Sequence, residues 1–117
     1  MEDAHFDYEL FQSNVIHHNL TKIIVPLTAP TLTAALTVYA KQFMADIIYF
    51  DSFQEEIESF IEMCRLWDVL RVGGIMVGEE GVDLTKFARL MNLNVEYMND
   101  NIWRLEKTEQ KSCWLYV

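Results

Sequence analysis

The stretch ADIIYFDSFQEEIESFIEMCRLWDVLRVGGIMVGEEG, residues 45–81, decides the fold. It opens with the apolar run ADIIYF at 45–50, which predicts a strand buried on both faces of a parallel sheet. An amphipathic helix follows, with acidic residues near its start as the helix dipole favours. Gly73 and Gly74 are expected to end that helix and to open the strand GIMVG at 74–78. Strand, helix and strand in this order predict a right-handed crossover and the α/β class.

The helix between these strands is expected to have one apolar and one acidic face. The apolar face is predicted to comprise Ile57, Phe60, Ile61, Cys64, Leu66 and Trp67. Glu55, Glu56, Glu58 and Glu62 are expected largely on the opposite face. This division predicts a helix that packs one side on the sheet and leaves the other in water.

The rest of the chain continues the alternation of helices and strands. A helix is predicted over 7–18, a strand over 22–27 that Pro26 halts, and a helix after Pro30. Downstream we expect a helix over 82–92 and strands over 94–99 and 101–107, joined by a turn at Asn99-Asp100-Asn101, with 110–117 as an extra strand or a tail. The expected fold is one domain, 1–117, with a Rossmann-like, mostly parallel sheet, flanking helices and a C-terminal antiparallel hairpin.

Composition and charge limit the classes of function. A chain of 117 residues holds one core, and an apolar share of 51% excludes disorder. The net charge of −9 and the lack of a basic stripe argue against nucleic acid and anionic lipid as partners. The sequence has neither an apolar run of membrane-spanning length nor a signal-peptide layout at its acidic start, which predicts a cytoplasmic location. Cys64 and Cys113 lie far apart in the sequence and are expected to be reduced thiols.

The carboxyl ends of the predicted strands indicate where a ligand would bind. In open α/β sheets this is the edge beyond those ends. Asp51 and Ser52 follow one strand, and Glu79 and Glu80 follow the next. The three carboxylates would suit Mg²⁺ or Ca²⁺, or would orient substrate hydroxyl groups. The alternative is that Asp51 caps the following helix and that Glu79 and Glu80 are solvated loop residues.

Residues 45–81 resemble the second half of a class I S-adenosylmethionine-dependent methyltransferase domain of the small-molecule type. The helix and strand expected within 8–35 resemble the segment that precedes it in that family, and NIWRLEK at 101–107 resembles the family's closing strand. The resemblance covers roughly residues 8–107. It implies S-adenosylmethionine as cofactor, Mg²⁺ as a further cofactor, and a small molecule or sugar as substrate.

The resemblance also assigns site residues. It places Asp51 and Ser52 beside the methyl donor, with Asp51 as the catalytic aspartate and a metal ligand. Glu79 and Glu80 take the positions of two metal-binding aspartates. Gln54 and Glu56 replace a histidine and a tyrosine of the family pattern, and a glutamine cannot serve as a general base at neutral pH.

One departure from the family concerns cofactor binding. The family's first strand, its glycine-rich loop and the acid that ends its second strand all precede the region matched here. None of the glycines, Gly73, Gly74, Gly78 and Gly81, forms a G-x-G-x-x-G pattern. Two expectations follow: a methyltransferase-like domain, truncated relative to the family, or a degenerate, non-catalytic α/β module. Without the family's first strand, the chain would pair its strands differently, complete its sheet with the edge of a second copy or a partner chain, or be poorly stable.

Overall fold

The computed structural model describes residues 4–51, 56–79 and 84–113, and these form an α/β fold. The elements are α1 (Ala4–His17), α2 (Thr31–Ala40), β1 (Ala45–Phe50), α3 (Glu56–Val69), β2 (Leu70–Glu79), α4 (Thr85–Met91), β3 (Glu96–Asn99) and β4 (Ile102–Glu106). The predicted bounds of β1 are confirmed, and those of α2, α3, α4 and the closing hairpin agree to within a few residues. None of the helices in these ranges has the length and hydropathy that a membrane span requires.

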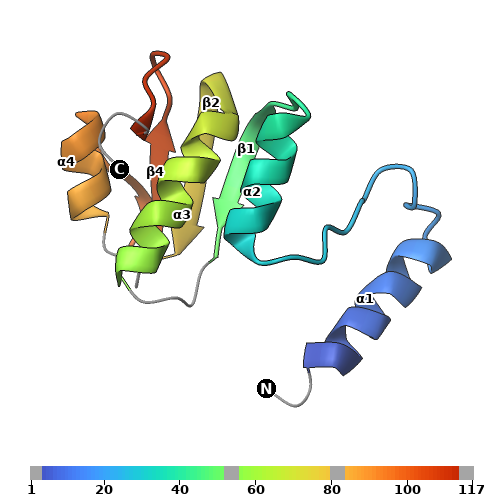
Figure 1. Cartoon of the computed structure of the whole chain (residues 1–117). Coiled ribbons are helices and arrows are strands. Elements are labelled where there is room, and N and C mark those ends of the chain that lie inside the picture. The colour runs from blue at the N-terminus through green and yellow to red at the C-terminus, as the bar shows by residue number, and fades with distance from the viewer. Residues whose placement is uncertain (1–3, 52–55, 80–83, 114–117) are drawn as a thin grey trace.

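The described strands form one mixed sheet in the order β1-β2-β4-β3. β1 pairs parallel to β2, while β4 pairs antiparallel to both β2 and β3. Figure 1 shows α2, α3 and α4 against one face of this sheet. The predicted α/β class, flanking helices and C-terminal antiparallel hairpin are confirmed. The sheet is mixed, however, where a mostly parallel sheet was expected, because the closing hairpin supplies two of the four described strands and gives two antiparallel pairings against one parallel pairing.

The core lies between the sheet and its helices. Phe50, Gly78 and Trp103 are register partners across three strands and all are buried. The rings of Phe50 and Trp103 lie 6.5 Å apart across Gly78. A Cβ atom added at Gly78 would come within 2.3 Å of Trp103 Cζ2, so only glycine allows the indole to cross β2 here. Trp67 of α3 completes the aromatic packing, with its ring 5.3 Å from that of Phe87 in α4.

Two strand predictions are wrong. Each depends on which other elements pack against the strand, and the sequence of the strand does not contain that information. Residues 22–27 form no strand, because Pro26 lacks a donor and no described strand pairs with this segment. β1 is not buried on both faces, since the helices that pack on the sheet within the described residues all lie against one face. Phe50 is 2% exposed on the covered face, whereas Ile47 is 64% and Tyr49 52% exposed on the other.

The expected division of α3 holds for most residues and fails at two. Phe60, Ile61, Cys64, Leu66 and Trp67 are buried or half-buried, and Glu58 is exposed. Glu62, expected on the polar face, is buried, and Ile57, expected on the apolar face, is exposed. Glu55 lies outside the described residues, and the side chain of Glu56 is not described. Figure 1 shows α3 between α2 and α4, with one of these helices on each side, and helical periodicity alone does not encode such neighbours.

The end of α3 also differs from the prediction. The helix ends at Val69 and β2 begins at once at Leu70, four residues before the expected start at Gly74. Lys107, just beyond β4, explains this because its buried ammonium donates to the carbonyls of Trp67 and Leu70, at 2.7 Å each. A distant cation thus caps the helix in place of the glycine pair.

The segment that precedes α2 stands apart from the sheet. Figure 1 shows α1 displaced from the helices that cover the sheet and joined to α2 by an irregular connection. In this arm, residues 4–30, Val15 is buried, but a set of large apolar side chains is exposed: Leu10, Phe11, Ile16, Ile23, Val25 and Leu27. The arm therefore contributes little to the core of the sheet.

Candidate functional site

The parallel pairing of β1 and β2 brings two of the expected site residues to one edge of the sheet. Phe50 and Gly78 are register partners, so the residues that follow them, Asp51 and Glu79, leave the sheet side by side. Both are exposed. Ser52 and Glu80, the other expected site residues, lie outside the described residues, as does Gln54. The expectation that Asp51 caps α3 also depends on residues outside the described part of the chain.

Tyr49 joins this edge, and the sequence did not single it out. Its hydroxyl group donates to Glu79 Oε1 at 3.0 Å. This hydrogen bond to a carboxylate raises the pKa of Tyr49 above its usual 10.0, and slight desolvation and the negative charges of Glu79 and Asp51 act in the same direction. The phenol is therefore held in its neutral, proton-bearing form well into alkaline solution.

Strand register could have identified Tyr49. Tyr49 pairs with Val77, and Glu79 lies two residues further along the same strand. Residues two apart share a face, and diagonal neighbours are within reach of a long side chain. A tyrosine two residues before a site aspartate in a parallel strand is therefore a candidate partner for the acid on the next strand.

The backbone of Glu79 is fixed from the covered side of the sheet. Trp103 Nε1 donates to the carbonyl oxygen of Glu79 at 2.9 Å, and Trp103 is itself 1% exposed. The carboxylate of Glu79 meanwhile accepts from Tyr49. An exposed acid is thus mounted on a rigid strand end, which is the kind of support a binding site needs.

The chemistry available at this edge is that of acceptor groups beside a phenol. Asp51 and Glu79 can accept hydrogen bonds from hydroxyl or ammonium groups of a ligand, and Tyr49 can relay or donate one. Within the described ranges, no group of three or more histidine, cysteine, aspartate or glutamate side chains could hold a metal ion. Two carboxylates alone fall short of the oxygen ligands that Mg²⁺ or Ca²⁺ takes, so a metal here needs further ligands.

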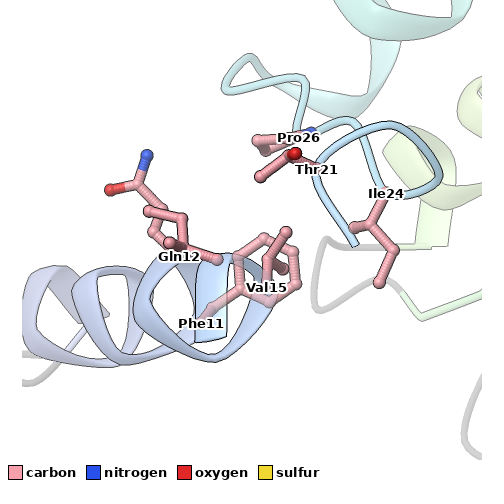
Figure 2. Close-up of a pocket in the computed structure, with 7 residues that line it drawn as sticks. Phe11, Gln12, Val15, Thr21, Ile24 and Pro26 are labelled. Carbon is pink, nitrogen blue, oxygen red and sulfur yellow. The ribbon is translucent and has the colours of Figure 1, made fainter. Parts of the chain in front are cut away.

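A pocket of about 190 Å³ lies elsewhere, in the arm. Figure 2 shows that α1 supplies Phe11, Gln12 and Val15 to it, facing Thr21, Ile24 and Pro26 of the connection. Its walls are mainly apolar and include no residue of the sheet. Its lining includes no charged residue, and its polar side chains are the Gln12 amide and the Thr21 hydroxyl, so we consider it a weaker candidate for a reaction site than the edge at Asp51.

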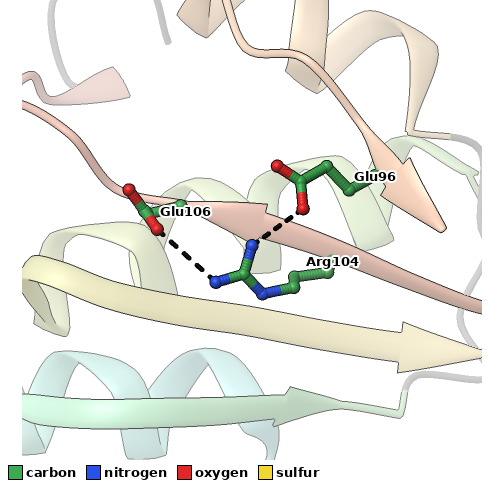
Figure 3. A network of polar contacts seen from close by, with 3 residues as sticks. All are labelled: Glu96, Arg104 and Glu106. Atoms are coloured by element: carbon green, nitrogen blue, oxygen red, sulfur yellow. Dashed lines mark hydrogen bonds and ion pairs between the residues drawn. The ribbon is translucent and has the colours of Figure 1, made fainter. Parts of the chain in front are cut away.

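The uncovered face of the sheet carries a second polar group. Arg104 donates to Glu96 Oε2 at 2.9 Å, and its other terminal nitrogen lies 3.4 Å from Glu106 Oε1 (Figure 3). Arg104 is the register partner of Val77, which pairs with Tyr49 on the far side of β2. This guanidinium is satisfied by its own neighbours, so it neutralises acids of the sheet and is not presented to a ligand.

Comparison with known proteins does not assign the chain to a family. No family model matches the sequence, and no curated protein matches it significantly.

Proposed function

We propose that this chain is an S-adenosylmethionine-dependent, methyltransferase-like domain that acts on a small molecule or sugar in the cytoplasm. The observation that carries the proposal is the parallel pairing of β1 and β2, which sets Asp51 beside Glu79 at the carboxyl edge of the sheet. That edge is where open α/β sheets bind ligands. Asp51 and Glu79, two of the residues to which the resemblance gives a role at the donor and the metal, follow register partners in these two strands, and this supports the proposal.

The described residues fit only part of the expected cofactor site. Asp51 is exposed and can accept hydrogen bonds from ligand hydroxyl groups, and Glu79 can do the same or contribute to a metal site. When bound, S-adenosylmethionine would supply an electrophilic methyl group, and this chain's own contribution would be to orient the ligand. The sequence holds no glycine-rich loop, so the remaining contacts would come from another polypeptide segment.

Titration calorimetry with S-adenosylmethionine, with and without Mg²⁺, tests this proposal. We expect a Kd of ~100 μM or tighter for the full chain, alone or with a completing partner. Asp51→Asn is expected to weaken binding about tenfold or more, as loss of a charged hydrogen-bond partner does. Glu106→Gln is the matched control, because Glu106 is an exposed acid at the opposite end of the sheet. Equal weakening by both variants would count against a site at Asp51.

A second candidate function is a non-catalytic association module. The observation that favours it is the outer edge of β1, which pairs with no other described strand, beside the exposed side chains of Ile47 and Tyr49. Unpaired edges with apolar neighbours are sites of strand addition by another chain. A chain that binds no S-adenosylmethionine, and whose self-association in sedimentation is abolished by Ile47→Lys, would support this function over the first.

A further inference from the structure

Two cysteines that lie 49 positions apart in the sequence meet in the core. Cys64 belongs to α3, and Cys113 lies in the segment that follows β4. Both side chains are 0% exposed, and both thiols are free. The sequence predicts two reduced thiols far apart in the chain, and both are free in the structure; their meeting is a result of the tertiary fold.

The surroundings of the two thiols are rich in sulfur. Cys113 Sγ lies 3.5 Å from Met91 Sδ of α4. Cys64 belongs to the same buried cluster and lies close enough to Cys113 for hydrogen bonding between the two thiols to shift both pKa values. Three elements, α3, α4 and the C-terminal segment, therefore converge on one group of sulfur atoms. Within the described residues no third histidine, cysteine, aspartate or glutamate joins them in a metal-binding group.

The hydrogen bond also makes the two thiols chemically unequal. It lowers the pKa of Cys64, against the effect of burial, with a smaller contribution from the positive charge of Arg65. The same hydrogen bond raises the pKa of Cys113, and burial acts in that direction too. Cys64 is thus the thiol that ionises first, which is the property of an attacking thiolate.

We propose that Cys64 and Cys113 form a reversible oxidation site, in which an intramolecular disulfide fastens the C-terminal segment to α3. The oxidant is a low-molecular-weight disulfide such as oxidised glutathione. The Cys64 thiolate attacks one of its sulfur atoms, forming a mixed disulfide and releasing one glutathione thiolate. Cys113 then loses its proton and attacks the Cys64 sulfur, releasing the second glutathione thiolate. Two thiols of the chain are oxidised, and one disulfide of the oxidant is reduced.

Access to the buried thiols comes from opening of the segment that carries Cys113. The described side-chain hydrogen bonds of residues 108–113 to the rest of the fold include Lys111 Nζ to the Leu90 carbonyl, at 3.4 Å, and the contact of Cys113 with Met91. Such local openings cost less free energy than global unfolding. Once formed, the disulfide closes a long loop and so restricts the unfolded chain, which stabilises the fold.

The test uses the full chain, equilibrated in buffers of defined reduced and oxidised glutathione without denaturant. Acid quenching, maleimide labelling and intact mass then report the state of both thiols, and peptide mapping locates the link. We expect a monomer lighter by two hydrogen atoms, unlabelled at both cysteines, linked 64 to 113, and with a Tm raised by ~5 °C or more. Reduction with dithiothreitol should return the original mass and Tm.

Three results would overturn the proposal: glutathione held on a single cysteine as the final product, disulfide-linked dimers, or oxidation only at denaturant concentrations that unfold the chain. Met91→Leu is the matched control, since it keeps both thiols and a similar volume, and it should still form the link. Cys113→Ser should not. Because peptide mapping of the unsubstituted chain identifies the link directly, the result stands even where a serine variant folds poorly. None of these readouts depends on the proposed function.

Discussion

Two neighbouring rows of residues cross the same three strands and meet opposite environments. One row runs Phe50, Gly78, Trp103 under the helices, and its members are buried. The next row runs Tyr49, Val77, Arg104 on the other face, where Tyr49 is half exposed and Arg104 pairs with acids. A shift of one residue along each strand thus separates the core from solvent. The comparison teaches that the described part of the chain covers one face of its sheet with helices and leaves side chains on the other face exposed to solvent.

The covered row should carry the largest single contribution to stability. Trp103→Ala is expected to lower the free energy of unfolding by about 3–5 kcal/mol, because it removes a fully buried indole and its hydrogen bond to the Glu79 carbonyl. Urea denaturation followed by circular dichroism measures the change. Tyr97→Ala is the control, since Tyr97 is the register partner of Trp103 but is 60% exposed. Similar losses in the two variants would contradict the attribution of this cost to the burial of the Trp103 indole.

Substitution of Lys107 should give the second largest loss of stability. Lys107→Met is expected to cost about 2–3 kcal/mol, because it removes a charged donor from the carbonyls of Trp67 and Leu70. It also leaves the buried Asp68 carboxylate, whose oxygens accept no hydrogen bond among the described residues, without its nearby cation. Adding Asp68→Asn to Lys107→Met should recover part of the loss in a double-mutant cycle. Strictly additive costs would show that the two charges do not interact.

A pair of adjacent isoleucines offers a smaller and more local comparison. Ile48 packs against the core cluster, whereas Ile47 is 64% exposed on the open face. Ile48→Thr should lower the free energy of unfolding by about 1–2 kcal/mol, and Ile47→Thr by less than about 0.5 kcal/mol, since threonine keeps the branching that suits a strand. Denaturation at low protein concentration measures the monomer. A large cost at Ile47 would mean that the open face is covered in solution.

The pH dependence of stability should show whether the Lys107 ammonium is desolvated in the folded chain. Burial lowers the pKa of Lys107 from its usual 10.5, partly opposed by the charge of Asp68. Between the folded pKa and 10.5 the unfolded chain binds more protons than the folded one, so stability rises with pH in that window. The unfolding free energy of the wild type, measured relative to that of Lys107→Met, should therefore increase as the pH approaches 10.5. A constant difference across this range would contradict a desolvated ammonium.

The smallest expected effect is a change in the pKa of Tyr49, at the edge of the sheet that holds Asp51 and Glu79, and it can be followed by spectroscopy. The hydrogen bond to Glu79 is the main cause that raises the pKa of Tyr49, so we expect this tyrosine to ionise at a pH above the usual 10.0. Glu79→Gln removes the negative charge and should move the pKa of Tyr49 back toward 10.0, measured by ultraviolet difference titration against Tyr49→Phe. Glu106→Gln should leave that titration unchanged. An unaltered Tyr49 in Glu79→Gln would show that the hydrogen bond does not form in solution.

The sequence predicts features that depend on nearby residues and misses those that depend on distant ones. β1, the closing hairpin and the helices follow from local periodicity and turn residues, and the meeting of Asp51 and Glu79 follows from parallel pairing. Residues 22–27 have strand composition but find no partner strand, and composition cannot show that. The end of α3 was misplaced because its cap is Lys107, some 40 residues away in the chain.

That capping contact has a consequence for the order in which the protein folds. The helix before β2 can form its internal hydrogen bonds locally, but the Trp67 carbonyl in its last turn and the Leu70 carbonyl at the start of β2 accept from a residue that follows β4. During synthesis, the ribosome therefore completes α3, β2 and α4 before the side chain that finishes α3 exists. A contact of this sequence separation raises contact order and slows the final step. Until residue 107 has been added, the Trp67 carbonyl in the last turn of α3 lacks this donor.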